Sequence, residues 1–558
     1  MTRRLLALAA SLVILGGCTS IPNSGDVLSA ELATPTVSAG VDVLPPGPSA
    51  GATQEDILVG FIAAGAAAQD NYRVARSYLT QNEQAAWNPN ALTLIRSGEP
   101  IITPTSGSEL RYEAAVAASV DELGQYLNSP GSSNQALDFQ FVRESGEWRI
   151  SSAPDGIVVS EAAFQEAFDS YRLYYFSSGY RDLVADLRWF ASRGEVSTKI
   201  VRALLAPPAF WLDQGATVSA FPAGTGLALT PIPVVDGVAT VDLTSAVVNA
   251  DDTARARMLV QLNASLQQVQ GISSARISIN QNELVIPALG DEGPTLASGR
   301  DPRLVVLANR SFGFLQSGQF EKIDVLSQSV ATLIPDSIFY SQQFNEALLT
   351  RGDGLWRLDG VGQPSLLDER EGLVRGIIDS CDYSWSSTST LSADMISVFD
   401  SSGVASALGL ELVGESSLVS FELARDNTRL LLLIQSPSGV RVLVTSVARD
   451  SDCRPESFSD FVELGVVSGD AIDAAWVDDT SVAVVTEDPL TQLAEVTVFA
   501  IGGRSSSLGQ PARPVTLVGG VGGISGLRIL SEDGIVYQPR GQGWQATSDR
   551  ASVLATQR

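Results

Sequence analysis

The feature that most constrains the fold is a pattern that recurs from about Pro302 to the C-terminus. A turn cluster precedes one apolar strand-like segment and then a second, with a period that drifts between about thirty and sixty residues. Such hairpins cannot bury their own sheets, but they do so when arranged as blades around a ring. The early strands in "RLVVLANRSFGFLQSG" lack a leading partner, so we expect them to complete the last blade and close the ring. Residues 300–558 are therefore predicted to form a β-propeller of about six blades, without a strong amphipathic helix.

Four acidic residues stand in turns before predicted strands of this region: Asp394, Asp426, Asp479 and Asp533. They suggest either a calcium or catalytic cluster, or local hydrogen bonds to backbone N–H groups in turns that are spread around the ring. The second interpretation is favoured, because aspartate commonly serves this purpose in turns.

The N-terminus has the pattern of an export signal. Arg3 and Arg4 precede an uncharged apolar run that is too short to span a bilayer, and "LGGC" ends at Cys18. This lipobox predicts a lipoprotein signal peptide over 1–17, with Cys18 carrying a diacylglycerol and a fatty acyl chain such as palmitate. The alternative is a free cysteine in a discarded leader. A lipidated Cys18 anchors the chain to the cell membrane, on its extracytoplasmic side.

Composition excludes several functions. The chain has 63 acidic and 36 basic residues among 558, a formal net charge of −27, so nucleic-acid binding is not expected. Histidine is absent, which removes Ser-His-Asp and Cys-His catalysis and the usual zinc and copper ligand sets. We therefore predict no catalytic residues, no metal site and no cofactor, and a protein that is not an enzyme.

Two cysteines remain after Cys18, namely Cys381 and Cys453. They are too few for a thiolate metal site. They either form one disulfide or remain as two buried thiols, and an oxidising compartment favours the disulfide.

Residues 18–51 are rich in Ser, Pro, Gly and Thr and read as a flexible tether. Over 52–158, a helix predicted in "QEDILVGFIAAGAAAQDNYRVARSYLT" precedes strand-like segments and a hairpin at Ser145-Gly146. This order predicts an N-terminal α+β domain similar to the nuclear transport factor 2 (NTF2)-like cone. The cone either holds a ligand pocket or serves as a spacer packed on its own core, and the spacer is favoured.

The region 160–290 alternates strands and helices. A hairpin is expected in "YRLYYFSSGYRDLVADLRWFA", a helix stopped by Pro207-Pro208, a turn at Asp236-Gly237, and a helix capped by Asp252 or Thr253. The order of "RALLAPP", "FPAGTGL" and "VATVDLTS" resembles the GerMN domain, an α+β domain of spore-germination proteins. Asp242 is expected on the solvated face of a strand.

The lipobox followed by "TSIP", the GerMN-like region and the irregular propeller together resemble the actinobacterial lipoprotein LpqB family. The resemblance implies an accessory lipoprotein that binds the extracytoplasmic domain of a sensor histidine kinase (MtrB-like). Through it, members influence two-component signalling, cell-envelope homeostasis and cell division.

Two other functions are compatible with parts of the sequence. A binding protein for an envelope lipid or glycan would use the cone or the propeller face, where Trp356, Trp385, Trp476 and Trp544 are candidates for stacking on sugars. A hydrolase that uses only carboxylates needs a pair of defined separation, which the sequence does not indicate.

Overall fold

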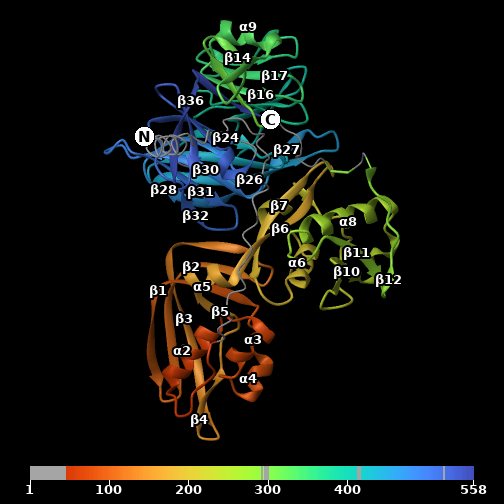
Figure 1. Ribbon diagram of the computed structural model, residues 1–558, viewed down its shortest axis with the longest axis vertical. Coiled ribbons are helices and arrows are strands. Elements are labelled where there is room, and N and C mark those ends of the chain that lie inside the picture. The colour runs from red at the N-terminus through yellow and green to blue at the C-terminus, as the bar shows by residue number, and fades with distance from the viewer. Residues whose placement is uncertain (1–44, 291–292, 295–300, 411, 413–415, 520–521) are drawn as a thin grey trace, which may run out of the picture. The chain divides into compact units, whose positions relative to one another are not determined.

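The computed structural model describes residues 45–558 except 291–292, 295–300, 411, 413–415 and 520–521 (Figure 1). The predicted lipobox, Cys18 and most of the predicted tether lie outside these residues. Among the helices that are described, none combines the length and the apolar character needed to cross a membrane.

The N-terminal unit is a curved five-stranded sheet, in the order β4-β3-β2-β1-β5, with short helices against it. Only β5 runs parallel to its neighbour, β1. Its elements are α2 (Gln54–Ala64), α3 (Gln69–Arg76), α4 (Gln81–Ala86), β1 (Leu92–Ser106), β2 (Glu109–Asp121), β3 (Tyr126–Glu144), β4 (Glu147–Ser152), β5 (Ile157–Ser160) and α5 (Glu161–Ala167).

Local sequence explains where α2 begins. Thr53 accepts a hydrogen bond from the backbone N–H of Asp56 at 3.1 Å, and the Asp56 carboxylate accepts one from the Thr53 N–H at 2.9 Å. This reciprocal capping satisfies two N–H groups that the first turn leaves without helical partners. The predicted hairpin at Ser145-Gly146 is confirmed, because β3 and β4 pair across that turn and both turn residues have positive φ.

The second unit contains two small sheets joined by helices. Their strand orders are β7-β6-β8 and β12-β11-β10-β9, and α8 contacts β6 of one sheet and β11 of the other. The elements are β6 (Phe168–Ser177), β7 (Leu183–Ala191), α6 (Val196–Leu205), α7 (Phe210–Asp213), β8 (Thr217–Val218), β9 (Val234–Val235), β10 (Val238–Leu243), η1 (Ser245–Asn249), α8 (Asp252–Leu266), β11 (Ser274–Ile279) and β12 (Asn282–Glu283).

Two expectations for this unit were wrong. Asp242 is buried, because parallel strand β11 lies beside it: its carboxylate accepts bonds from the Ser278 hydroxyl at 2.7 Å and the Gln281 N–H at 2.9 Å. The cap of α8 is Asp251, whose side chain accepts the N–H of Ala254 at 2.7 Å. The turn at Asp236-Gly237 is confirmed as the link between β9 and β10.

In the described part of the chain the strands of the third unit form one eight-stranded sheet, which comprises two blades joined at β37, and four sheets of four or five strands; this makes six blades, as predicted. The first blade is shared: C-terminal β37 pairs with β13, which closes the ring as expected. The first three blades and their helix comprise β13 (Leu304–Ala308), β14 (Ser311–Gln316), β15 (Gln319–Lys322), α9 (Asp324–Leu333), β16 (Ser337–Ser341), β17 (Glu346–Arg351), β18 (Gly354–Leu358), β19 (Pro364–Asp368), β20 (Ile377–Ile378), β21 (Ser384–Ser387), β22 (Ile396–Phe399) and β23 (Ala405–Leu408), with β37 (Val553–Gln557).

The last three blades run without interruption by a long helix. They comprise β24 (Ser417–Leu423), β25 (Arg429–Ser436), β26 (Gly439–Arg449), β27 (Pro455–Phe458), β28 (Val462–Val467), β29 (Asp470–Trp476), β30 (Ser481–Glu487), β31 (Ala494–Ala500), β32 (Ser505–Ser507), β33 (Pro514–Val518), η3 (Gly523–Gly526), β34 (Arg528–Ser531), β35 (Ile535–Arg540) and β36 (Gly543–Arg550).

The helix α9 contradicts the expectation of a propeller without an amphipathic helix. Leu326 and Val330 are fully buried, one helical turn apart, and the Ser327 hydroxyl accepts the Phe312 N–H at 2.9 Å. Its sequence contains serine, threonine and valine, which have low helix propensity, so the sequence indicates a helix only weakly. Packing against β14 is what stabilises this helix.

Candidate partner-docking groove

A buried ion pair on the hairpin β6–β7 connects this hairpin with the first unit and with α7. On β7, the Arg188 guanidinium donates to the Asp186 carboxylate at 3.0 and 2.5 Å, and both side chains are buried. Arg188 also donates to the backbone carbonyl of Leu123 in the first unit at 3.2 Å. The Asp186 carboxylate accepts the N–H of Ala209, just before α7, at 2.9 Å. Burying either charge alone would be costly. Here the two charges neutralise each other, and the pair also forms hydrogen bonds with backbone groups of two loops.

The same hairpin is bound to the propeller. Trp189 on β7 donates its indole N–H to the carbonyl of Gly502, after β31, at 2.8 Å. Arg429, at the start of β25, donates to the carbonyl of Ala185 at 3.2 Å. At the hairpin turn, the Ser178 hydroxyl donates to the Arg449 carbonyl at 3.0 Å. These contacts fix β7 against blades four and five.

A groove of about 600 Å³ lies where the three units meet, and we call it the junction groove. Its walls come from the start of β3, from β7, from α7 and from β28 and β31. Three large apolar side chains on these walls are exposed: Leu127 at 50%, Phe210 at 52% and Val466 at 49%. Apolar side chains gathered at one exposed groove are typical of surfaces that bind another protein.

Two strand edges border the junction groove. β28 is the outer strand of its half of blade four: it pairs with β26, and no other described strand pairs with its second edge. The second edge borders the start of β3, near Leu127. Here β3 pairs with β2 but with no other described strand, because β4 pairs only with the far end of β3, Gln140–Glu144. Unpaired backbone N–H and C=O groups at such edges are ready to pair with an extended segment of another chain.

The predicted disulfide is present in the structure, which joins Cys381 and Cys453 with their Cα atoms 6.3 Å apart. Cys381 precedes β21 in blade three and Cys453 lies between β26 and β27 of blade four, so the bond connects adjacent blades. Arg181, in the β6–β7 turn, has its guanidinium 3.9 Å from the Cys381 sulfur.

The four turn aspartates do not converge. Asp426 is buried and accepts the N–H groups of Thr428 and Arg429 at 2.9 and 3.2 Å, as the local interpretation predicts. Asp394 and Asp533 each accept a hydrogen bond from the hydroxyl of the serine two residues before them. The backbone carbonyl of Asp479 accepts a hydrogen bond from the Arg429 guanidinium. Each stands in a different blade, and the described residues contain no group of three or more potential metal ligands.

The propeller core contains a charged group that sequence reasoning missed. The Arg375 guanidinium donates to the Asp473 carboxylate at 3.0 and 3.2 Å, and the Trp476 N–H donates to buried Glu422 at 3.2 Å. Burial raises the pKa of Glu422 to about 7, even though Arg375 acts in the opposite direction. They connect neighbouring blades, since Arg375 precedes β20 of blade three, Glu422 lies on β24 of blade four and Asp473 lies on β29 of blade five.

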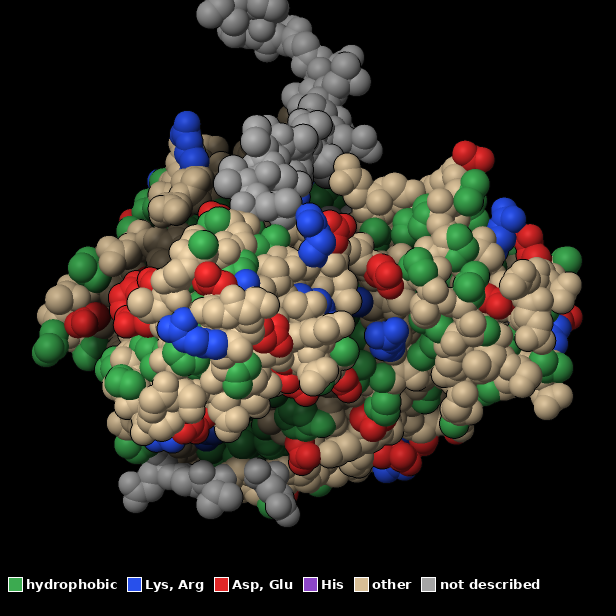
Figure 2. Space-filling view, turned by 90° about the horizontal axis from the view of Figure 1, so that it is seen from below, with side chains coloured by type: hydrophobic (Ala, Val, Ile, Leu, Met, Phe, Trp, Pro, Cys, Tyr) green, Lys and Arg blue, Asp and Glu red, His purple; other side chains and the backbone are tan. Residues whose placement is uncertain are grey.

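The four tryptophans considered for sugar stacking divide into two pairs. Trp385 and Trp476 are buried, with indole N–H groups bonded to the Asp379 carboxylate and the Glu422 carbonyl, both at 2.9 Å. Trp356 and Trp544 are half-buried. On the face shown in Figure 2, acidic and basic side chains are scattered singly among apolar ones, and no broad basic patch is visible.

These observations define a class: a multidomain protein, mostly β, with an N-terminal α+β unit, a GerMN-like unit and a six-bladed propeller in its described residues. Two family models of one lipoprotein match the chain: the N-terminal domain of lipoprotein LpqB over residues 47–165 and its β-propeller domain over 351–553. A sporulation and spore germination model matches 172–285 between them. The chain belongs to the lipoprotein LpqB family.

Curated relatives agree with this assignment. The chain is 29% identical to lipoprotein LpqB of Cutibacterium acnes over 52% of its length and 49% of the relative's. It is 26% identical to that of Bifidobacterium longum over 73% of its length and 72% of the relative's. Among solved structures, the first GerMN domain of the Bacillus subtilis sporulation protein GerM is 17% identical, with 23% of this chain and 97% of that one covered and a TM-score of 0.19.

Proposed function

We propose that this chain is a lipid-anchored extracytoplasmic protein, attached through Cys18, that binds the sensor domain of an MtrB-like histidine kinase and modulates two-component signalling without catalysing a reaction. Membership of a lipoprotein family supports the anchor. The observation that carries the binding function is the junction groove, where exposed Leu127, Phe210 and Val466 lie beside the free edge of β28.

The groove suits a protein partner better than a small substrate. Its walls offer backbone edges and apolar side chains. Its charged groups Asp186 and Arg429 are buried and already bonded, and exposed Glu463 pairs with Arg441 at 2.7 Å. An extended segment of the kinase's outer domain would add to β28 through main-chain hydrogen bonds, while its apolar side chains contact Phe210 and Val466. The buried contacts of β7 hold the walls in place, which lowers the entropic cost of binding.

Anchoring complements this binding. A protein held at the membrane surface meets a membrane kinase at a raised effective concentration, so a modest affinity is sufficient. To change kinase output, the chain must bind one conformational state of the sensor domain more tightly than the other, since equal affinity shifts no equilibrium.

The test measures binding of the purified kinase sensor domain to the chain by surface plasmon resonance. Phe210→Asp combined with Val466→Asp is expected to raise the Kd at least tenfold, because it places charges in the apolar groove. The matched control is Ile101→Asp, at a residue that is 61% exposed on β1 and lies outside the groove. Equal Kd values for the double variant and the control would reject the groove as the docking site. Absence of any binding by the unaltered chain would reject the kinase as partner.

A further inference from the structure

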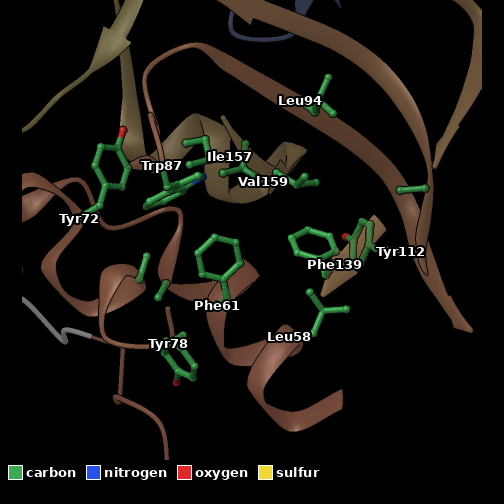
Figure 3. Packing of buried hydrophobic residues seen from close by; sticks show 14 of the residues in the cluster. Leu58, Phe61, Tyr72, Tyr78, Trp87, Leu94, Tyr112, Phe139, Ile157 and Val159 are labelled. Atoms are coloured by element: carbon green, nitrogen blue, oxygen red, sulfur yellow. The ribbon is translucent and has the colours of Figure 1, made fainter. Parts of the chain in front are cut away.

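The N-terminal unit encloses a separate cavity of about 170 Å³ within its own core. Figure 3 shows Phe61 of α2, Phe139 of β3, Leu94 of β1 and Ile157 of β5 around it. Other apolar lining groups are Ile62, Trp87, Leu92, Leu137 and Val158. Four structural elements thus contribute an apolar wall, and the exposed side chain of Gln135 places part of the lining at the protein surface.

The walls of this cavity are held by contacts that oppose collapse. The ring of Phe61 packs on Trp87 at 5.0 Å and on Phe139 at 6.1 Å between centroids. The Trp87 indole N–H is fixed to the carbonyl of Pro154 at 3.2 Å. Protein cores are usually packed without voids of this size. A preformed space whose walls are held by packed aromatic rings is therefore typical of a ligand-binding cavity.

The chemistry of the lining selects an apolar occupant. Besides backbone, its polar side chains are Gln135, which is exposed, and Asp155, whose carboxylate accepts the Asn88 N–H at 2.7 Å. No lysine or arginine lines the space, so an anionic ligand finds no cationic partner inside. Dry apolar cavities of roughly 150 Å³ take up benzene in other proteins, so the volume suits a short stretch of hydrocarbon.

We propose that this cavity binds the end of a lipid hydrocarbon chain, with the rest of the lipid leaving past Gln135 into water. A chain end needs no hydrogen-bond partner, and each methylene buried contributes about 0.8 kcal/mol. Two sources of this chemistry are open to a membrane-anchored protein: a lipid of the surrounding membrane and an acyl chain on the protein's own Cys18. The site is distinct from the junction groove, with no lining residue in common.

The first experiment titrates the delipidated full chain with the uncharged fluorophore N-phenyl-1-naphthylamine and displaces it with decanoic acid. Leu137→Trp, which fills the cavity, is expected to raise the Kd at least tenfold. Val142→Trp is the matched control, on the same strand but 42% exposed and outside the lining, and should bind like the parent chain. A folded Leu137→Trp variant should also melt at a higher temperature, because it removes a void. If that variant does not fold, Ile62→Phe, which fills the cavity from α2, takes its place in the same titration.

The second experiment distinguishes the sources of the lipid. The chain and its Cys18→Ala variant are purified from membranes in mild detergent and examined by native mass spectrometry. A co-purifying lipid in both identifies a membrane lipid. A cavity closed to the fluorophore in the parent chain but open in Cys18→Ala identifies the protein's own acyl chain. Failure of both the delipidated parent and the delipidated Cys18→Ala variant to bind the fluorophore, or equal binding by the folded cavity-filling variant, would overturn the proposal. Neither result depends on kinase binding.

Discussion

Arg188 and Asp186 stand two residues apart on β7 and form a buried ion pair, with N–O distances of 3.0 and 2.5 Å and guanidinium and carboxylate lying side by side. Because the pair also bonds Leu123 and Ala209, it connects the first unit, the hairpin and α7 at the wall of the junction groove.

Asp186→Ala is expected to lower the free energy of unfolding by about 3–5 kcal/mol, since it leaves the Arg188 cation buried without a partner. Urea denaturation followed by circular dichroism measures the change. Replacing both residues, as Asp186→Leu with Arg188→Met, should cost much less than Asp186→Ala alone, because no unpaired charge remains. A double variant as unstable as Asp186→Ala would contradict the charge argument.

Removing the disulfide should destabilise the propeller. Cys381 and Cys453 are 72 residues apart in sequence, and closing a loop of that length restricts the unfolded chain by up to about 4 kcal/mol. Thermal melting with and without dithiothreitol measures the effect. The Cys381→Ser, Cys453→Ser double variant serves as the control and should melt at one temperature under both conditions. A reductant that leaves the melting temperature of the parent chain unchanged would argue against a stabilising bond.

The raised pKa of Glu422 predicts how the free energy of unfolding depends on pH. Burial raises its pKa to about 7 in the folded state, so the folded protein holds this proton at pH values where the unfolded chain releases it. Its stabilising contribution is therefore complete below about pH 4.5 and is lost as the pH rises through 7. Urea midpoints of Glu422→Gln should fall less steeply with rising pH than those of the parent chain. The control is Glu495→Gln, on the exposed side of β31, which should keep the parent's slope.

Gly156, just before β5, is expected to tolerate no side chain. Its φ is +100°, and a Cβ there would stand 2.3 Å from the carbonyl oxygen of Leu92. Gly156→Ala should therefore cost more than about 2 kcal/mol, adding a steric clash to the backbone strain. Gly146→Ala, at φ +87° with open space around it, should cost only about 1 kcal/mol. Similar unfolding midpoints for the two variants would contradict the steric explanation.

Sequence alone determined those features that depend on neighbours in the chain. The turns at Ser145-Gly146 and Asp236-Gly237 were predictable because each contains a glycine, which adopts positive φ readily, and α6 because Val196, Ile200 and Leu204 recur at helical spacing. The propeller and its approximate number of blades followed from the repeated hairpin, since every blade must bury its sheet against the next.

Tertiary structure alone decided features that depend on distant neighbours. Asp242 is buried because β11 lies beside it, and the side-chain oxygen of buried Gln261 on α8 accepts the N–H of Ala220 at 2.8 Å. The junction groove exists because segments around Leu127, Phe210 and Val466, far apart in sequence, meet through the contacts of β7. Burial and hydrogen bonding between such segments arise only in the folded chain, so the local periodicity of the sequence cannot predict them.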